Sequence, residues 1–435
     1  MRLVRAARQL QSGPIAQLSM LSLLLRLFSI AIVFALSVAT ARLLGPRGYG
    51  AVAWVISVAQ LMAVLSTFGF AALAVKEIPS RLLKSDYSEL SSHLTTGFRI
   101  TLWLSITGAI GFFLILSQRN NTNLTVGALL TIPLAFLYLF RGWAQGFKSV
   151  PLAQIPGEIC RPLLVITSIA LLYFTGVSVS EHSFLTASLF SYSLAALIAF
   201  ATIKFKVIDP LPKSEPKFKP DFHQSLPLLG LAFAAVLQGE INTLMLGWLA
   251  GSEETGLFQP VARIAPLMLL AVEATSMAYA PRVAELWRGG DRDRIQNLTT
   301  KFSRTTAGLT ILFGLAVLVM SKQLMAVFGR EFVTVSGIIW VVVAAQVLNA
   351  CCGPVGALLT MTGHSKLALA GQCAGLITNA GLAYFLVPTH GAIGACLSMA
   401  GGIIVWNLAM LAAVSAKLQV DPTIFGISQK SRSAV

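Results

Sequence analysis

Residues 18–41 read LSMLSLLLRLFSIAIVFALSVATA, an apolar stretch whose one charged residue is Arg26. A transmembrane helix needs roughly 20 mostly apolar residues, so this stretch is long enough to cross a bilayer. It exceeds the roughly 7–15 apolar residues of a typical signal peptide, and no small-residue cleavage pattern follows it. We therefore expect a membrane-spanning helix here, anchored on its cytoplasmic side by Arg2, Arg5 and Arg8.

Similar apolar stretches recur along the whole chain. Of the 435 residues, 56% are hydrophobic and only 11% are charged, whereas a soluble domain carries about 25% charged residues. Only helices or closed barrels satisfy all backbone groups in lipid, and these stretches are too long for barrel strands. We expect an all-α polytopic membrane protein with about twelve transmembrane helices, near residues 18–41, 49–75, 94–116, 122–146, 152–175, 182–203, 224–250, 256–281, 304–321, 333–361, 366–387 and 391–415.

The net charge of +15 needs an explanation, since a basic protein can bind nucleic acid. In the predicted order of spans, the basic residues concentrate on one side of the membrane, in 204–219 and 282–304. An excess of Lys and Arg marks cytoplasmic loops, which places both termini in the cytoplasm. The charge is thus an orientation signal and an attraction to anionic membrane lipids, and we expect no nucleic-acid partner.

A linker rich in lysine and proline, KFKVIDPLPKSEPKFKP at residues 204–220, follows the sixth predicted span. Proline disfavours a regular helix, so this segment reads as a hinge between two halves. We expect an N-terminal six-helix lobe at 1–203 and a cytoplasmic linker at 204–223. A C-terminal six-helix lobe at 224–417 and a cytoplasmic tail at 418–435 complete the chain.

An internal repeat supports this division. The segments joining spans one and two and spans seven and eight each carry two glycines five residues apart. These are Gly45 and Gly50 in the first half, and Gly251 and Gly256 in the second. Glycine suits such tight reversals because it tolerates positive φ. Parallel repeats of this kind build transporters that work by alternating access.

Several motifs resemble a known family. The stretch ARLLGPRGYG at 41–50 resembles the signature of Wzx-like polysaccharide repeat-unit flippases, which belong to the multidrug/oligosaccharidyl-lipid/polysaccharide exporter superfamily. The run NTLMLG at 242–247, then ETGLF at 254–258 and Ala262-Arg263, resembles the family pattern around spans seven and eight. Pro281 and the basic stretch after it also fit, and the resemblance covers nearly all of 18–415.

The resemblance implies a MATE- or lipid-flippase-like fold in the bacterial inner membrane. The implied activity moves undecaprenyl-diphosphate-linked oligosaccharides to the periplasmic leaflet for O-antigen or exopolysaccharide synthesis, with polymerase machinery as a partner. Asn242 stands where many relatives carry an aspartate. Glu240, two residues earlier, lies about 200° around the helix and cannot replace it. The resemblance therefore assigns no ion-coupling role at this position.

Arginines inside the spans are the main candidates for substrate binding, because charges within a membrane are costly. Arg26 and Arg263 lie at comparable depths in spans one and eight, and we expect them to face a cleft and hold the diphosphate. Arg161 is a third candidate. Snorkelling of Arg26 to the interface is the alternative, and it is the expected behaviour of Arg99 and Arg141 near span ends.

Acids and amides inside the spans admit two interpretations each. Glu158 could neutralise Arg161 three residues later, whereas Glu240 and Glu273 could carry a coupling proton or pair with an arginine. Buried amides more often bond between helices than contact a ligand, although some could bind sugar hydroxyls. These amides are Gln238 and Asn242, which share a face of span seven, and Asn349 and Asn379.

Other function classes find little support in the sequence. A GxxxxGK[ST] loop is absent, so we expect no ATP hydrolysis by this chain. The acids form no cluster of the kind a membrane-bound enzyme needs, and the five cysteines show no metal-binding spacing. We expect neither a metal nor a cofactor. An ion-coupled multidrug or small-molecule exporter on the same fold is the alternative to a glycan flippase.

Overall fold

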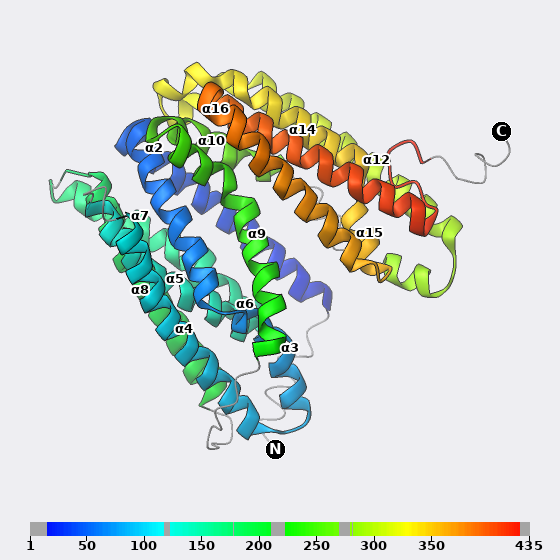
Figure 1. The fold of residues 1–435 in the computed structure, drawn as a ribbon, viewed down its shortest axis with the longest axis horizontal. Helices are drawn as coiled ribbons and strands as arrows, with labels where there is room; N and C mark the ends of the chain where they lie inside the picture. Colours follow the sequence, from blue (N-terminus) through cyan, green and yellow to red (C-terminus); the bar gives the residue numbers. More distant parts are fainter. Residues whose placement is uncertain are drawn as a thin grey trace. The chain divides into compact units, whose positions relative to one another are not determined.

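A computed structural model describes residues 15–116, 122–176, 178–209, 222–268, 279–280 and 282–426. These residues fold into helices joined by short turns, with no β-strand among them (Figure 1). The predicted all-α fold is confirmed.

Nine helices of the described residues are long and apolar enough to cross a membrane. Two of them are much longer than one crossing requires: Leu24–Ser66 has 43 residues and Ser365–Leu418 has 54. At about 1.5 Å per residue they measure ~65 and ~80 Å, against a hydrocarbon core of ~30 Å. Each contains one non-helical glycine, Gly45 and Gly391. Each therefore has the length of two spans, although the predicted total of twelve stays a prediction.

The chain divides into two compact units. Unit 1 comprises residues 1–44 and 51–240, and unit 2 comprises 45–50 and 241–435. The division falls inside one helix, α9 (Phe222–Leu249). The boundary between the units thus lies later in the chain than the linker expected at 204–223. Residues 210–221 of that linker lie outside the described residues. The lobe boundaries stay a prediction.

Unit 1 is built around α5 (Thr122–Gly146), whose apolar window is 78% buried. This helix packs against α3, α4 and α8, so its side chains line the middle of the unit. The remaining elements are α2 (Ile15–Ser66), α3 (Phe70–Leu83), α4 (Tyr87–Leu116), α6 (Val150–Gln154), the π-helix η2 (Ile155–Cys160), α7 (Arg161–Phe174), α8 (Glu181–Ile203) and the π-helix η3 (Lys204–Ile208).

Unit 2 is organised by α16 (Ser365–Leu418), which packs against α10, α14 and α15. At the break in α16, Ala392 N–H donates a 2.7 Å hydrogen bond to Glu254 Oε2. This bond satisfies a backbone donor that the non-helical residue Gly391 leaves free. The other elements are α10 (Ser252–Met268), α12 (Arg292–Val319), α13 (Ser321–Phe328), the 3₁₀-helix η4 (Arg330–Ile338), α14 (Ile339–Cys352) and α15 (Val355–Met361).

The glycine pairs of the internal repeat meet within unit 2. The first glycine of each pair has positive φ, 65° at Gly45 and 92° at Gly251, as expected for a break between helices. The second glycines serve another purpose, which is close packing. A Cβ at Gly50 would overlap the Ser252 carbonyl oxygen, and a Cβ at Gly256 would overlap the carbonyl oxygen of Pro46. The two segments thus approach backbone to backbone in a reciprocal way.

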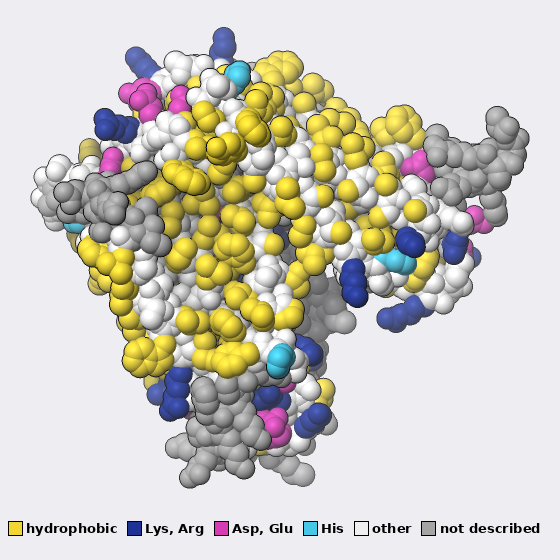
Figure 2. All heavy atoms as spheres, in the orientation of Figure 1, with side chains coloured by type: hydrophobic (Ala, Val, Ile, Leu, Met, Phe, Trp, Pro, Cys, Tyr) yellow, Lys and Arg dark blue, Asp and Glu magenta, His cyan; other side chains and the backbone are white. Residues whose placement is uncertain are grey.

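Hydrophobic side chains cover much of the face that Figure 2 shows. Phe174 is 83% exposed, and Phe385 and Ile377 are exposed to a similar extent. Soluble monomers rarely present apolar patches of this extent, so this surface fits contact with lipid. The structure agrees with a multi-pass membrane protein.

Candidate functional site

Unit 1 contains a cavity of about 210 Å³ with an unusual number of ionisable groups. Its polar lining comes from α2, α5, η2 and the start of α7, and we call it the charged cavity. The polar residues that line it are Gln60, Tyr138, Arg141, Glu158 and Arg161.

The local sequence explains how Glu158 reaches this cavity. Pro156 lacks an N–H group and cannot donate a helical hydrogen bond, and residues 155–160 form a π-helix around it. The wider π turn presents Glu158 to α5, where its Oε1 lies 2.9 Å from Arg141 Nη2. Short π segments of this kind are frequent at functional sites.

The ion pair corrects one expectation from the sequence. Glu158 pairs with Arg141 on another helix rather than with Arg161, because the π-helix ends directly before Arg161 and the regular i,i+3 geometry is lost. The Arg141 side chain is 46% exposed, and its expected snorkelling stays a prediction. Sequence reasoning also missed Tyr138, although its spacing of three from Arg141 places both on one face of α5.

Arg161 lacks a carboxylate partner within 4.0 Å in the described part of the chain. Its guanidinium carbon lies 5.0 Å from the centroid of the Tyr192 ring on α8, a cation–π distance. Nearby, the Tyr138 hydroxyl donates to Gln60 Oε1 at 3.3 Å. Arg161 is half-buried, and its guanidinium therefore has hydrogen-bond donors available to a ligand in the charged cavity.

Arg26 lies on the face of α2 that turns toward the same segment. Ser22, four residues before it, accepts a 2.9 Å hydrogen bond from Gln154 Nε2. Ser29, three residues after it, donates a 3.0 Å hydrogen bond to the backbone oxygen of Glu158. Residues three and four apart share one face of a helix. The exposed Arg26 is thus a neighbour of the segment that carries Glu158 and Arg161.

Glu240 lies on α9 within unit 1 and is half-buried. Its Oε2 accepts a 2.5 Å hydrogen bond from Ser57 Oγ, and Ser57 is only 2% exposed. The partner that the structure gives Glu240 is therefore a hydroxyl group. A proton-coupling role for this carboxyl stays a prediction.

The candidates in unit 2 are amides and one arginine. Asn349 Oδ1 accepts a 2.9 Å hydrogen bond from Asn407 Nδ2, which links α14 to α16, and this confirms interhelical bonding for Asn349. Asn242 and Asn379 are buried, and Arg263 is exposed on α10. Gln238, which lies on α9 in unit 1, is half-buried. Glu273 lies outside the described residues.

No group of three or more His, Cys, Asp or Glu side chains in the described ranges could hold a metal ion. What unit 1 offers instead is a small cavity with one neutralised ion pair and one arginine beyond it. Such an arrangement can attract and orient an anion through a guanidinium, whose planar set of donors matches phosphate oxygens.

Comparison with known proteins identifies the family of this chain. The sequence profile of a family described as "polysaccharide biosynthesis protein" matches residues 16–287. A comparison with curated protein sequences finds no match.

Solved structures share the fold. A multidrug resistance MATE family transporter of the MOP superfamily, in an inward-facing conformation, gives a TM-score of 0.71 at 13% identity, with 90% of this chain and 94% of the other covered. The lipid II flippase MurJ, in an inward closed conformation, gives 0.65 at 16% identity, with 91% and 87% covered. A MOP superfamily transporter from Pyrococcus furiosus gives 0.58 at 15% identity, with 94% and 97% covered. The predicted MATE- and flippase-like fold is confirmed.

Proposed function

Because the chain belongs to the polysaccharide biosynthesis protein family, we propose that it is a flippase for lipid-linked oligosaccharides. Its substrate would be an undecaprenyl-diphosphate-linked repeat unit, moved from the cytoplasmic to the periplasmic leaflet by alternating access. The protein would lie in the bacterial inner membrane with both termini in the cytoplasm and supply a polysaccharide polymerase. H⁺ or Na⁺ would be the coupling ion where one is used.

One observation carries the proposal: Arg161, which lines the charged cavity, has no carboxylate within 4.0 Å in the described part of the chain. Arg141 is neutralised by Glu158, whereas Arg161 lies over a tyrosine ring and Arg26 lies on the adjoining face of α2. An arginine without a carboxylate partner suits a diphosphate, which is the common anionic part of these substrates. A site for organic cations would instead need a carboxylate without an arginine partner.

We assign Arg26, Arg161 and Arg263 to the diphosphate. Glu158 orients Arg141 and keeps the positive charge of the site moderate, because too many unpaired guanidinium groups would hold the product too tightly to release it. Asn242, Asn379 and Gln238 are the proposed contacts for sugar hydroxyls, whereas Asn349 is bonded to Asn407.

The test is complementation of a bacterial strain that lacks its glycan flippase, combined with an assay of which leaflet holds the lipid-linked oligosaccharide. The wild-type chain should restore translocation, and an Arg26→Ala/Arg263→Ala variant should not. An Arg42→Ala/Arg288→Ala variant is the matched control, because both arginines are exposed and lie on α2 and in unit 2 respectively.

Normal translocation by the Arg26→Ala/Arg263→Ala variant would contradict the diphosphate assignment. A wild-type chain that moves organic cations but no lipid-linked glycan would establish the exporter alternative in its place.

A further inference from the structure

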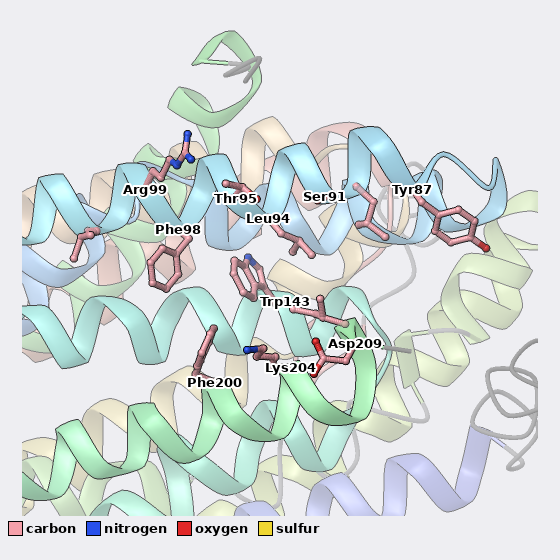
Figure 3. A pocket seen from close by; sticks show the side chains of 13 residues that line it. Tyr87, Ser91, Leu94, Thr95, Phe98, Arg99, Trp143, Phe200, Lys204 and Asp209 are labelled. Carbon is pink, nitrogen blue, oxygen red and sulfur yellow. The ribbon is translucent and has the colours of Figure 1, made fainter. Parts of the chain in front are cut away.

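A second cavity in unit 1 is about three times larger than the charged cavity. It measures about 630 Å³ and lies between α4, α5 and the end of α8 with η3 (Figure 3). We call it the α4–α8 groove. Most of its lining is apolar and includes Leu94, Phe98 and Phe200. Its volume falls within the ~300–1,000 Å³ typical of ligand sites.

A hydrogen-bond donor at the bottom of this groove lacks a partner. Trp143 on α5 lines the groove and is 3% exposed, and its indole Nε1 finds no acceptor among the described residues. A buried donor without a partner destabilises the protein, because it has lost its hydrogen bonds to water. The geometry therefore points to a ligand that brings an acceptor to Trp143.

A positively charged side chain lines the same groove. Lys204 lies at the end of α8, and Figure 3 shows Trp143 between it and α4. The Lys204 amine also lies 6.0 Å from the ring centroid of Phe200. Asp209 lines the same wall, and Arg99 lines the groove with its guanidinium turned away from Trp143. The charges of the lining sum to one positive charge.

The groove also opens at a particular level of the membrane. In the predicted topology, the start of α4 and the end of α8 both lie at the cytoplasmic interface. Anionic lipids of this leaflet attract basic residues by about 1 kcal/mol for each Lys or Arg near the surface. The π-helical turn η3 presents Lys204 at this level.

We propose that the α4–α8 groove binds one anionic phospholipid of the cytoplasmic leaflet. Its phosphate accepts hydrogen bonds from Lys204, an ester carbonyl accepts the bond from Trp143, and an acyl chain lies along Leu94, Phe98 and Phe200. The two donors lie at different depths, which matches a phosphate and an acyl ester on one glycerol. A free phosphate or a polyprenyl diphosphate lacks the ester carbonyl. The site is independent of the proposed transport activity.

Native mass spectrometry of the full-length protein in mild detergent tests the proposal. The probes are phosphatidylglycerol, phosphatidylcholine with the same acyl chains, a polyprenyl diphosphate and inorganic phosphate. The wild-type protein should retain one phosphatidylglycerol in preference to the other three. Lys204→Gln should weaken this binding about fivefold, from the attraction of one surface cation. Lys206→Gln is the matched control, because Lys206 is exposed on the same turn but does not line the groove.

A Trp143→Phe variant separates the two contacts. It keeps the ring and removes the indole donor, so both phospholipids should bind more weakly by a similar factor. Equal retention of both phospholipids by the wild-type protein, or equal binding by the Lys204→Gln and Lys206→Gln variants, would overturn the proposal. Preferred binding of the polyprenyl diphosphate would assign the groove to the transport substrate and overturn it too. Lys204 is exposed, so its variant keeps the test valid if Trp143→Phe fails to fold.

Discussion

Unit 1 encloses Arg141, Glu158 and Arg161 around one cavity, whereas unit 2 joins α14 to α16 through Asn349 and Asn407. The first set is ionisable and includes an arginine without a carboxylate partner in the described chain. The second set is neutral, and its amides bond to each other.

The difference separates two uses of polar groups inside a membrane protein. Amides that bond across helices hold helices together, by about 0.6 kcal/mol on average. Charges are more costly, and their retention inside a span indicates a function. The contrast therefore predicts that substitutions in the charged cavity change transport, whereas substitutions in the amide pair between α14 and α16 change stability.

The largest effect on stability is expected at the glycine crossing of unit 2. Gly50→Ala or Gly256→Ala places a methyl group against a backbone carbonyl that cannot move away. Overpacking of this kind costs about 1–3 kcal/mol, so the midpoint of thermal unfolding in detergent should fall clearly. Gly308→Ala on α12 is the control, because a Cβ there meets no atom within 4 Å. Equal unfolding midpoints for all three variants would show that the crossing is not tight.

The next largest effect is expected on the rate of translocation, in variants of Arg161. Arg161→Gln removes a charged donor to phosphate, which is worth about 1.5–3 kcal/mol, and should slow translocation at least about tenfold in the leaflet assay. Arg161→Lys keeps the charge but loses the planar set of donors, so it should recover part of the rate. Translocation at the wild-type rate by Arg161→Gln would remove the main contrast between the units.

The sequence predicts the fold well because each membrane helix can be recognised from its own residues alone. Hydrophobicity and length reveal a membrane helix without reference to its neighbours, and a glycine can indicate a break, as at Gly45 and Gly251. Gly50 and Gly256 look the same in the sequence but serve a contact between distant segments. The repeat of glycines was visible, whereas their packing against each other was not.

The site is harder to predict because its pairs are distant in the sequence. Glu158 was expected beside Arg161, yet a π-helical turn directs it to Arg141 on α5. Proline and glycine at 156 and 157 were the signal that the helix is irregular there. The Asn349–Asn407 bond joins residues 58 apart, so only packing could reveal it.

A smaller effect should follow from the Arg141–Glu158 ion pair. Its side chains are 46% and 23% exposed, so solvent screens the pair and its contribution should be near the upper end of surface pairs, about 1 kcal/mol. Arg141→Gln and Glu158→Gln should each lower stability, and the double variant should lose less than the sum. A double-mutant cycle on unfolding free energies measures this coupling. Strict additivity would mean that the pair contributes nothing to stability.

The smallest effect is expected in unit 2. Asn349→Ala removes a 2.9 Å bond to Asn407 and a longer one to Gln346, so unfolding should cost about 0.6 kcal/mol less. Translocation should stay within about twofold of wild type, because a neutral interhelical bond leaves the charge of the transport site unchanged. Gln372→Ala is the control, since this amide is exposed on α16. A strong loss of transport by Asn349→Ala at unchanged stability would instead assign Asn349 to the sugar. Asn349 would then join Arg263 as a proposed substrate contact in unit 2.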